Sequence, residues 1–385
     1  MSSNQIVKVG IIGCGLVTQV VHIPTLGFLS DYFNITFLCD VSPAALEHSA
    51  KKVINHVPQT TQDASELCAS PNVDVVLLAN PDEYHAVHAI EALKHDKHVL
   101  IEKPMALCER DADAIIAAEG NSKGKVMIGY MRRYAPAFED LVNEVGGMEK
   151  ITYARVRDII GPNSHFVSQS AMFPKAFIDF STEAVDDLKS KQDDIINQAL
   201  AVECGIPVTP EATKAWRFLG GLGSHDLSAM REALGMPQKV VGASLGPIWK
   251  YDAPRWLSAL KLITFTSVIF EYPGFSVTYE TGIDDIPRFD AHVEVYSKQK
   301  SVRVCYDTPF VKGLPINLLI RENLDGTYRE SIVRKTYEDP YTVEFKKLYD
   351  MVVNRKAVKT TAKDAKEDLK IFQMIMKAGV RPGGQ

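Results

Sequence analysis

The sequence lacks any Cys-x-x-Cys pair, and its six cysteines are scattered along the chain: Cys14, Cys39, Cys68, Cys108, Cys204 and Cys305. This spacing excludes a zinc knuckle and gives no disulfide framework, so we expect small core thiols. Histidines gather only between His85 and His98, where no cysteine or paired carboxylate completes a ligand set. We therefore expect no bound metal.

Long apolar runs are also missing, since none approaches the roughly 18 residues that a membrane-spanning helix requires. Residues 1–5 have neither the basic region nor the apolar core of a secretory signal. An excess of positive charge is absent as well, because 43 Lys and Arg stand against 48 Asp and Glu. We expect a cytoplasmic protein with neither a membrane nor a nucleic acid as partner.

Repeats and low-complexity tracts are absent too, and the remaining composition is that of an ordinary globular protein. Hydrophobic residues make up 46% of the chain and charged residues 24%. Its 385 residues exceed what one hydrophobic core usually serves. Two domains are therefore expected.

The amino-terminal stretch is an apolar strand that ends in glycine. Residues 7–12 form a β-branched run typical of a buried parallel strand. Gly13 permits a turn that a side chain would obstruct, and Gly15 lets backbone amides approach a pyrophosphate. Leu16 and Val17 begin the helix that follows. This stretch predicts the first half of a dinucleotide site.

Asp40 supplies the second half, because it ends the next apolar strand and can accept hydrogen bonds from ribose hydroxyls. An acid at this position favours NAD, with NADP as the alternative coenzyme. The fingerprint is imperfect, since Thr18 occupies its third small position. A tight turn without a ligand is the alternative interpretation of the glycines alone.

Short strands and helices continue to alternate as far as residue 129, which predicts a doubly wound parallel sheet. Ligands of such sheets bind outside the carboxyl ends of the strands. Asn80, Glu102, Lys103 and Tyr130 all follow such ends. His85 begins a helix beside the expected cleft and is kept as a neighbour of the cofactor.

Beyond residue 129, half-buried strands with short turns predict a large, mostly antiparallel open sheet: 151–157, 239–243, 262–272, 275–281, 292–296, 302–306, 316–321 and 328–333. Helices should cover one face. The other face needs cover too, and a second subunit is the simplest source. We therefore expect a homodimer or homotetramer formed through this sheet.

Two further segments have distinct patterns. Residues 161–217 show no strand signal and are too long for a simple connection, so we expect a lid, a subunit contact or a surface insertion without function. A glycine-rich run then leads into a helix that carries His225 in its first turn. A closing helix is expected over 361–378, with Thr361 as its N-cap.

Four motifs carry a family resemblance: Gly10-Ile11-Ile12-Gly13-Cys14-Gly15, Glu102-Lys103-Pro104, Gly129-Tyr130-Met131-Arg132-Arg133-Tyr134 and Gly223-Ser224-His225-Asp226. Over nearly the whole chain they resemble the glucose-fructose oxidoreductase / inositol dehydrogenase / rhizopine-catabolism (Gfo/Idh/MocA) family. The resemblance implies a Rossmann domain, here residues 1–130, and a substrate-binding and oligomerisation α+β domain, here residues 131–385. It also implies hydride transfer between NAD(P) and a sugar, polyol or related small molecule.

The resemblance also implies roles for two residues. Lys103 matches the active-site lysine of the family, and His225 matches the histidine that usually serves as acid/base. The sequence departs from the family at Gly221, where an aspartate commonly orients that histidine, and at Asn80, which replaces a threonine. Lys103 is therefore the stronger catalytic candidate.

The chemistry supports these assignments, because alcohol oxidation needs a base and carbonyl reduction needs an acid that stabilises the alkoxide. Candidates for contact with the substrate are Tyr130, Arg132, Asp158 and His165. Residues of these types at strand ends also serve structure alone, and His225 has the alternative of a capping or core histidine. The segment 161–217 is expected to shape the substrate pocket.

Three alternatives to a dehydrogenase stay open. Members of the family that retain NAD hydrolyse glycosides through transient oxidation. A non-catalytic dinucleotide-binding regulator, similar to the galactose-pathway repressor of yeasts, is favoured by Gly221 but not by the retention of Lys103 and His225. Reduction of an imine or an unsaturated ring would not need His225 as a base.

Overall fold

The computed structural model describes residues 5–54, 56–246, 249–250 and 262–380, and the chain divides into two compact units. Unit 1 consists of Met1–Tyr130, Ala171–Gly205 and Tyr341–Leu369, and unit 2 of Met131–Ser170, Ile206–Pro340 and Lys370–Gln385. The first division falls after residue 130. The segments Ala171–Gly205 and Tyr341–Leu369 pack with unit 1, whereas the sequence analysis counted them with the second domain.

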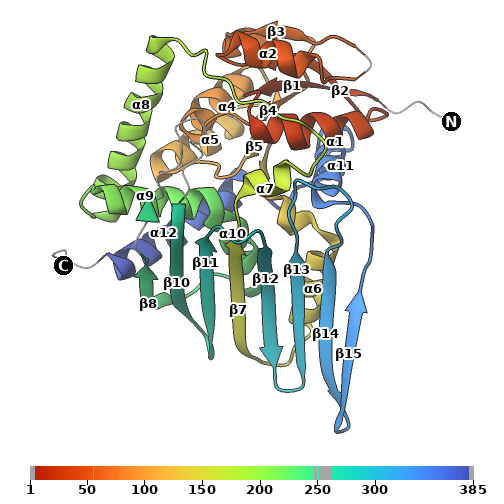
Figure 1. Cartoon of the computed structure of the whole chain (residues 1–385), viewed down its shortest axis with the longest axis vertical. Coiled ribbons are helices and arrows are strands. Elements are labelled where there is room, and N and C mark those ends of the chain that lie inside the picture. Colours follow the sequence, from red (N-terminus) through yellow and green to blue (C-terminus); the bar gives the residue numbers. More distant parts are fainter. Residues whose placement is uncertain (1–4, 55, 247–248, 251–261, 381–385) are drawn as a thin grey trace. The chain divides into compact units, whose positions relative to one another are not determined.

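Unit 1 contains the expected parallel sheet of six strands, in the order β3-β2-β1-β4-β5-β6 (Figure 1). The strands are β1 (Val7–Ile12), β2 (Phe33–Cys39), β3 (Gln59–Thr61), β4 (Val75–Leu78), β5 (His98–Glu102) and β6 (Val126–Gly129). The order reverses between β1 and β4, which is where open α/β sheets bind their ligands. The short polar strand β3 was not foreseen, because it has no apolar run.

Helices connect these strands: η1 (Thr18–His22), α1 (Ile23–Phe28), α2 (Pro43–Ala50), α3 (Ala64–Ala69), α4 (His85–Lys94) and α5 (Glu109–Gly120). Ser42 caps α2, since its hydroxyl accepts from the Ala45 amide at 2.9 Å. From the distant helix α11 (Pro340–Val353), Phe345 packs edge-on against Phe33 and His22, each with ring centroids 5.8 Å away. The core of unit 1 is therefore completed by a late part of the chain.

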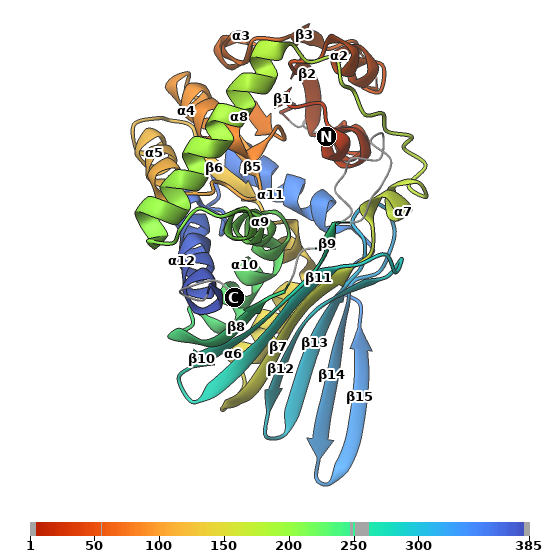
Figure 2. The same ribbon diagram turned by 60° about the vertical axis from the view of Figure 1, so that its left-hand side comes forward.

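The segment Ala171–Gly205, called the strap here, crosses the loops that follow the strands of unit 1. It contains an extended stretch, then α8 (Thr182–Asn197) and η4 (Gln198–Cys204). Figure 2 shows α8 running across α4 and α5. Its contacts fall after β1, β4 and β5: Lys175 amide to Gln19 at 2.9 Å, Tyr84 hydroxyl to Asp187 at 2.6 Å, and Arg110 to Asp194 at 2.8 Å. Most of the long segment without a strand pattern thus lies over the loops at the carboxyl edge of this sheet.

Unit 2 is built on the predicted open sheet, in the order β15-β14-β13-β12-β7-β11-β10-β8, with β9 paired to β10. The strands are β7 (Ile151–Ile160), β8 (Lys239–Leu245), β9 (Trp249–Lys250), β10 (Leu262–Tyr272), β11 (Phe275–Ile283), β12 (Phe289–Ser297), β13 (Lys300–Tyr306), β14 (Asn317–Leu324) and β15 (Thr327–Val333). Pairing between β7 and β11 is parallel, and the other pairings described in this sheet are antiparallel. The mostly antiparallel sheet is confirmed.

Helices cover one face of this sheet, as expected. Helix α6 (Pro136–Gly146) packs on β13 and β14, and α10 (Ser224–Leu234) packs on β7 and β12. The remaining helices are α7 (Asn163–Val167), α9 (Pro210–Phe218) and α12 (Ala362–Gly379), the last of which begins in unit 1. Thr361 caps α12 as predicted, since its hydroxyl accepts from the Asp364 amide at 3.2 Å.

The opposite face of the sheet carries cross-strand charge pairs. Arg157 lies 2.8 Å from Asp290 and 3.4 Å from Glu280, and Arg321 lies 3.3 Å from Glu294. Exposed apolar side chains of this sheet include Phe265 and Ile269 on β10 and Tyr328 and Ile332 on β15. Among the described helices of both units, none has the length and apolar character needed to cross a membrane.

Candidate active site

The turn after β1 is crowded, and only glycine fits its first position. Gly13 has φ +100°, and a Cβ there would lie 2.5 Å from the Asn80 nitrogen. At Gly15, by contrast, a Cβ would meet nothing within 4 Å, and the residue is exposed. One glycine therefore lets β1 and β4 approach, and the other leaves open space for a ligand beside the backbone.

Thr18, the irregular position of the glycine fingerprint, stabilises this turn. Its hydroxyl donates to the Gly13 carbonyl oxygen at 2.6 Å, and both residues are buried. Gln19 adds a second bond, from its Nε2 to the Cys14 carbonyl oxygen at 2.9 Å. The larger side chain at Thr18 is thus compatible with the turn, because it replaces close packing by hydrogen bonding.

Asp40 lies beside the same turn. One carboxylate oxygen accepts from the Cys14 amide at 2.7 Å, and the other accepts from the Ser42 amide at 2.8 Å. Burial raises the pKa of Asp40, the two amides oppose this, and the charge of Asp179 adds to the increase. Each oxygen keeps another acceptor position, so ribose hydroxyls can still donate to it.

The loop after β4 is joined to the loop after β5 by His85. Its Nδ1 lies 2.8 Å from the Pro104 carbonyl oxygen, and its Nε2 lies 3.2 Å from the Asn80 carbonyl oxygen. Burial lowers the pKa of His85 despite these two carbonyls. Because the ring is enclosed, it positions the loops; the sequence analysis had placed it as a neighbour of the cofactor.

The Glu102 carboxylate is buried immediately before Lys103. His22 Nε2 lies 3.0 Å from its Oε1, and the Lys103 amide donates to its Oε2 at 3.3 Å. Burial would raise the pKa of Glu102, but the hydrogen bond from His22 and the charges of His22 and Lys103 outweigh it, so the pKa is lowered. An ionised carboxylate therefore lies at the base of the half-buried Lys103.

Unit 2 holds a buried ionic cluster beside the helix of His225. Arg132 lies 3.0 Å from Asp158 and also contacts Asp226. Its guanidinium lies over the rings of Phe289 and Tyr306, at 5.5 and 5.2 Å from their centroids. All three charged side chains are almost fully buried.

The two aspartates of this cluster lie in one buried site. Burial and the adjacent charge of Asp158 raise the pKa of Asp226 well above its usual value, although Arg132 opposes the shift. Asp158 and Asp226 give the buried Arg132 the ionic partners that a charge in the protein interior requires.

His225 itself is half-buried in the first turn of α10, as predicted, and its carbonyl oxygen accepts from the Ser228 hydroxyl at 3.2 Å. Gly221, four residues earlier, is exposed, and a Cβ there would meet nothing within 4 Å. Space therefore does not require glycine at this position. Compared with the aspartate that the resemblance predicts here, Gly221 leaves the position without a carboxylate.

The residues expected to contact substrate have mostly structural surroundings. Tyr130 is buried and its hydroxyl donates to Asp368 at 2.6 Å. Arg132 and Asp158 are buried in the ionic cluster. His165 lies exposed on α7, with its Nε2 3.0 Å from the Gln169 amide nitrogen.

The structure thus gathers one set of predicted residues at the carboxyl edge of the unit 1 sheet: Gly13, Gly15, Leu16, Val17, Asp40, Asn80, Glu102 and Lys103. Arg132, Asp158 and His225 belong to unit 2. Sequence reasoning missed Gln19, His22, Asp179 and Asp226. Asp226 had a signal, since it directly follows His225, whereas the partners of the other three are set by tertiary contacts.

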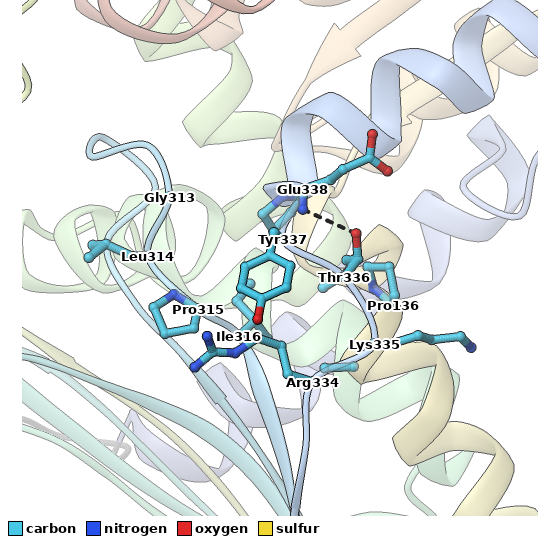
Figure 3. Close-up of a pocket in the computed structure, with 13 residues that line it drawn as sticks. Pro136, Gly313, Leu314, Pro315, Ile316, Arg334, Lys335, Thr336, Tyr337 and Glu338 are labelled. Carbon is cyan, nitrogen blue, oxygen red and sulfur yellow. Dashed lines mark hydrogen bonds between the residues drawn. The ribbon is translucent and has the colours of Figure 1, made fainter.

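A pocket elsewhere in unit 2 carries no such chemistry (Figure 3). Its two cations are already engaged: Arg334 donates to Asn317 at 3.0 Å and lies over the Tyr337 ring, and Lys335 donates to Asp140 at 2.6 Å. Within the described residues, no group of three or more His, Cys, Asp or Glu side chains could hold a metal ion.

Comparison with known proteins agrees with the glycine turn. Residues 7–130 match the model of the oxidoreductase family with an NAD-binding Rossmann fold. This region is similar to the NAD-binding Rossmann domain of that family. The arrangement at Gly13, Gly15 and Asp40 fits the coenzyme, because it leaves open backbone and acceptor positions where a dinucleotide needs them.

Similar curated proteins cover part of the chain. The Bacillus subtilis (strain 168) protein YteT is 31% identical over 132 residues, which are 33% of this chain and 31% of YteT. Inositol 2-dehydrogenase of Salmonella typhimurium (strain LT2) is 31% identical over 147 residues, 37% of this chain and 42% of that enzyme. The matched region thus spans less than half the length of these relatives.

Among solved structures, the fold extends to nearly the whole chain. The 3-ketoreductase KijD10 from Actinomadura kijaniata, in complex with NADP and TDP-benzene, aligns with a TM-score of 0.69. The alignment covers 97% of this chain and 98% of KijD10 at 13% identity. At that identity the likeness establishes the shared fold.

Substitution at Gly13 should damage the fold and the site together. In Gly13→Ala, the added Cβ meets the Asn80 backbone in a positive-φ conformation, so we expect a loss of about 2 to 5 kcal/mol in the free energy of unfolding. Urea denaturation measures this loss. Gly15→Ala is the matched control and should unfold like the wild type, yet bind NADH more weakly by fluorescence titration. Equal stability of both variants would contradict the crowding described here.

The raised pKa of Asp226 predicts a pH dependence of stability. Because the pKa of Asp226 is raised in the folded chain, its stabilising contribution is complete below the unfolded pKa of about 4 and is lost as the pH rises toward the folded value. Asp226→Asn cannot ionise. Its free energy of unfolding relative to the wild type should therefore increase above about pH 4, by up to about 1.4 kcal/mol per pH unit.

Urea denaturation from about pH 4, which is close to the pKa of an unfolded aspartate, up to about pH 8 tests this pH dependence. The exposed turn residue Asp325 provides the control, since Asp325→Asn should show a flat difference from the wild type. A flat difference for Asp226→Asn as well would mean that Asp226 is ionised in the folded protein.

Proposed function

We propose that the protein is an oxidoreductase that transfers hydride between a nicotinamide coenzyme, with NAD preferred, and a hydroxyl or keto group of a sugar, polyol or related small molecule. The observation that carries the proposal is Lys103, which follows a buried, ionised Glu102 at the carboxyl end of β5 in a domain similar to NAD-binding Rossmann domains. The similar inositol 2-dehydrogenase and the similarly folded 3-ketoreductase support this reaction class.

The coenzyme would be held by the turn after β1. Backbone amides near Gly15 would face its pyrophosphate, and Asp40 would accept from its ribose hydroxyls. When bound there, the nicotinamide accepts or supplies the hydride. The loops after β4 and β5 are fixed to each other through His85, so the protein presents this surface in a defined arrangement.

Lys103 is the proposed catalytic residue. Its amine can take the hydroxyl proton during oxidation, and its ammonium can stabilise the developing alkoxide during reduction. Glu102 and His22 act as positioning residues, because the buried carboxylate fixes the Lys103 backbone and places a negative charge beside it. His225 is the proposed second acid/base group. It lies in the first turn of α10, which also carries Asp226 of the Arg132 cluster.

A second candidate function is a regulator that binds a dinucleotide without turnover. Gly221 favours it, since the chain has room there for an aspartate that it does not carry. The two proposals differ in a dehydrogenase screen over polyols, aldoses and sugar acids with both coenzymes. A regulator would bind the coenzyme, but no substrate of these classes would change the absorbance of that coenzyme.

The open sheet of unit 2 is the proposed surface for a homodimer or homotetramer. Its alternating arginine and glutamate side chains are complementary to a second copy of the same face, and Ile269 adds exposed apolar area. The proposed substrate is a small molecule. The chain has no excess of positive charge that would favour nucleic acid as a partner.

Removal of the lysine amine tests the catalytic proposal. Lys103→Ala should lower kcat by about 10²- to 10⁴-fold, the usual contribution of general acid–base catalysis, and leave the Kd for NADH nearly unchanged. Lys94→Ala, on the exposed end of α4, is the matched control and should behave as the wild type. Wild-type turnover in Lys103→Ala would remove Lys103 from the mechanism.

The oligomeric state tests the surface. Sedimentation velocity of the wild type should give a dimer or tetramer. Ile269→Glu should shift it toward monomer, because it places an unpaired charge in the interface. Val87→Glu changes an equally exposed residue on α4 and should leave the assembly intact. A monomeric wild type would contradict the proposal.

A further inference from the structure

The strap brings a second carboxylate to the coenzyme side of unit 1. Asp179 lies on its extended stretch and is exposed, yet both of its carboxylate oxygens have partners at the start of α2. Oδ1 accepts from the Ser42 hydroxyl, and Oδ2 accepts from the Ala44 amide at 3.0 Å. These bonds lower the pKa of Asp179, so it is ionised at neutral pH.

Ser42 connects this carboxylate to Asp40. Its amide donates to Asp40, its hydroxyl donates to Asp179, and the same hydroxyl accepts from the Ala45 amide to cap α2. The two carboxylates are close enough that the charge of Asp179 raises the pKa of Asp40. Two negative charges therefore lie side by side at the end of β2.

The strap is fixed at this place by further contacts with unit 1. The Lys175 amide and carbonyl oxygen bond the Gln19 side chain at 2.9 and 3.0 Å, and the Phe177 ring lies 5.6 Å from the His48 ring. Lys52, which follows the end of α2, donates to the Met172 carbonyl oxygen. These contacts hold the part of the strap that precedes Asp179 against unit 1.

This arrangement matters for the choice between NAD and NADP, which differ by a phosphate on the ribose that Asp40 would bind. That phosphate carries about two negative charges at neutral pH. Its natural partners would be an arginine, or a hydroxyl and backbone amides at the start of α2, where the helix dipole favours anions. Here Asp179 already holds the Ser42 hydroxyl and the Ala44 amide.

We propose that Asp179 is a specificity-determining residue, which excludes the 2′-phosphate of NADP by occupying its hydrogen-bond donors and by repelling its charge. The inference rests on the proposed function, since it assumes that a nicotinamide coenzyme binds at Asp40. It assigns to the strap a role in coenzyme selection and names a carboxylate 137 residues away from Ser42 in the chain.

The test is the ratio of the Kd for NADPH to the Kd for NADH, measured by fluorescence titration of the full chain. Asp179→Asn removes the charge and nearly keeps the shape, and Asp179→Ser also frees the donors. Both should lower this ratio by about tenfold or more, which corresponds to about 1.4 kcal/mol, with NADH affinity nearly unchanged. Asp186→Asn, on the exposed side of α8 in the same strap, should leave the ratio as in the wild type.

Salt gives an independent readout that a merely structural role would not move. The wild-type ratio should fall as salt rises to about 1 M, where charges are screened beyond about 3 Å, and the Asp179→Asn ratio should respond less. An unchanged ratio in both Asp179 variants would overturn this inference alone. If the wild type bound neither coenzyme, the proposed function would fall with it.

Discussion

The close approach of the Gly13 backbone to Asn80 is the constraint on which the coenzyme side of the molecule depends. It requires a left-handed backbone at Gly13 and allows β1 and β4 to lie next to each other at the point where the sheet changes direction. The Cys14 amide then faces Asp40, and Thr18 closes the turn from the other side. A single residue without a side chain thus aligns the turn after β1 with Asp40.

Buried polar groups fix the neighbouring loops more than apolar packing does. His85 bridges two carbonyl oxygens from different strand ends, and His22 lies against Glu102 beneath the aromatic residues of α11. In the protein interior such contacts are directional and costly to break. These contacts hold the Lys103 backbone in a defined position. A reactive group has to be positioned in this way before a substrate arrives.

The sequence predicted what short-range patterns encode. Apolar runs located most strands of both sheets but not the polar β3, and glycine followed by Asp40 located the turn. It did not reveal distant partners, such as Asp368, which accepts from the Tyr130 hydroxyl 238 residues earlier. The same reason hid Asp179 and the charged face of the unit 2 sheet. Whether an arginine such as Arg132 contacts substrate or a buried aspartate depends on tertiary packing that no spacing reveals.

The threading of the chain through unit 1 has a consequence for its synthesis on the ribosome. Phe345 packs against Phe33 and His22, and the strap arrives only after Ser170. The first 130 residues therefore emerge long before the helix that completes their core. The packing of Phe33 and His22 therefore cannot be complete before residue 345 has been synthesised.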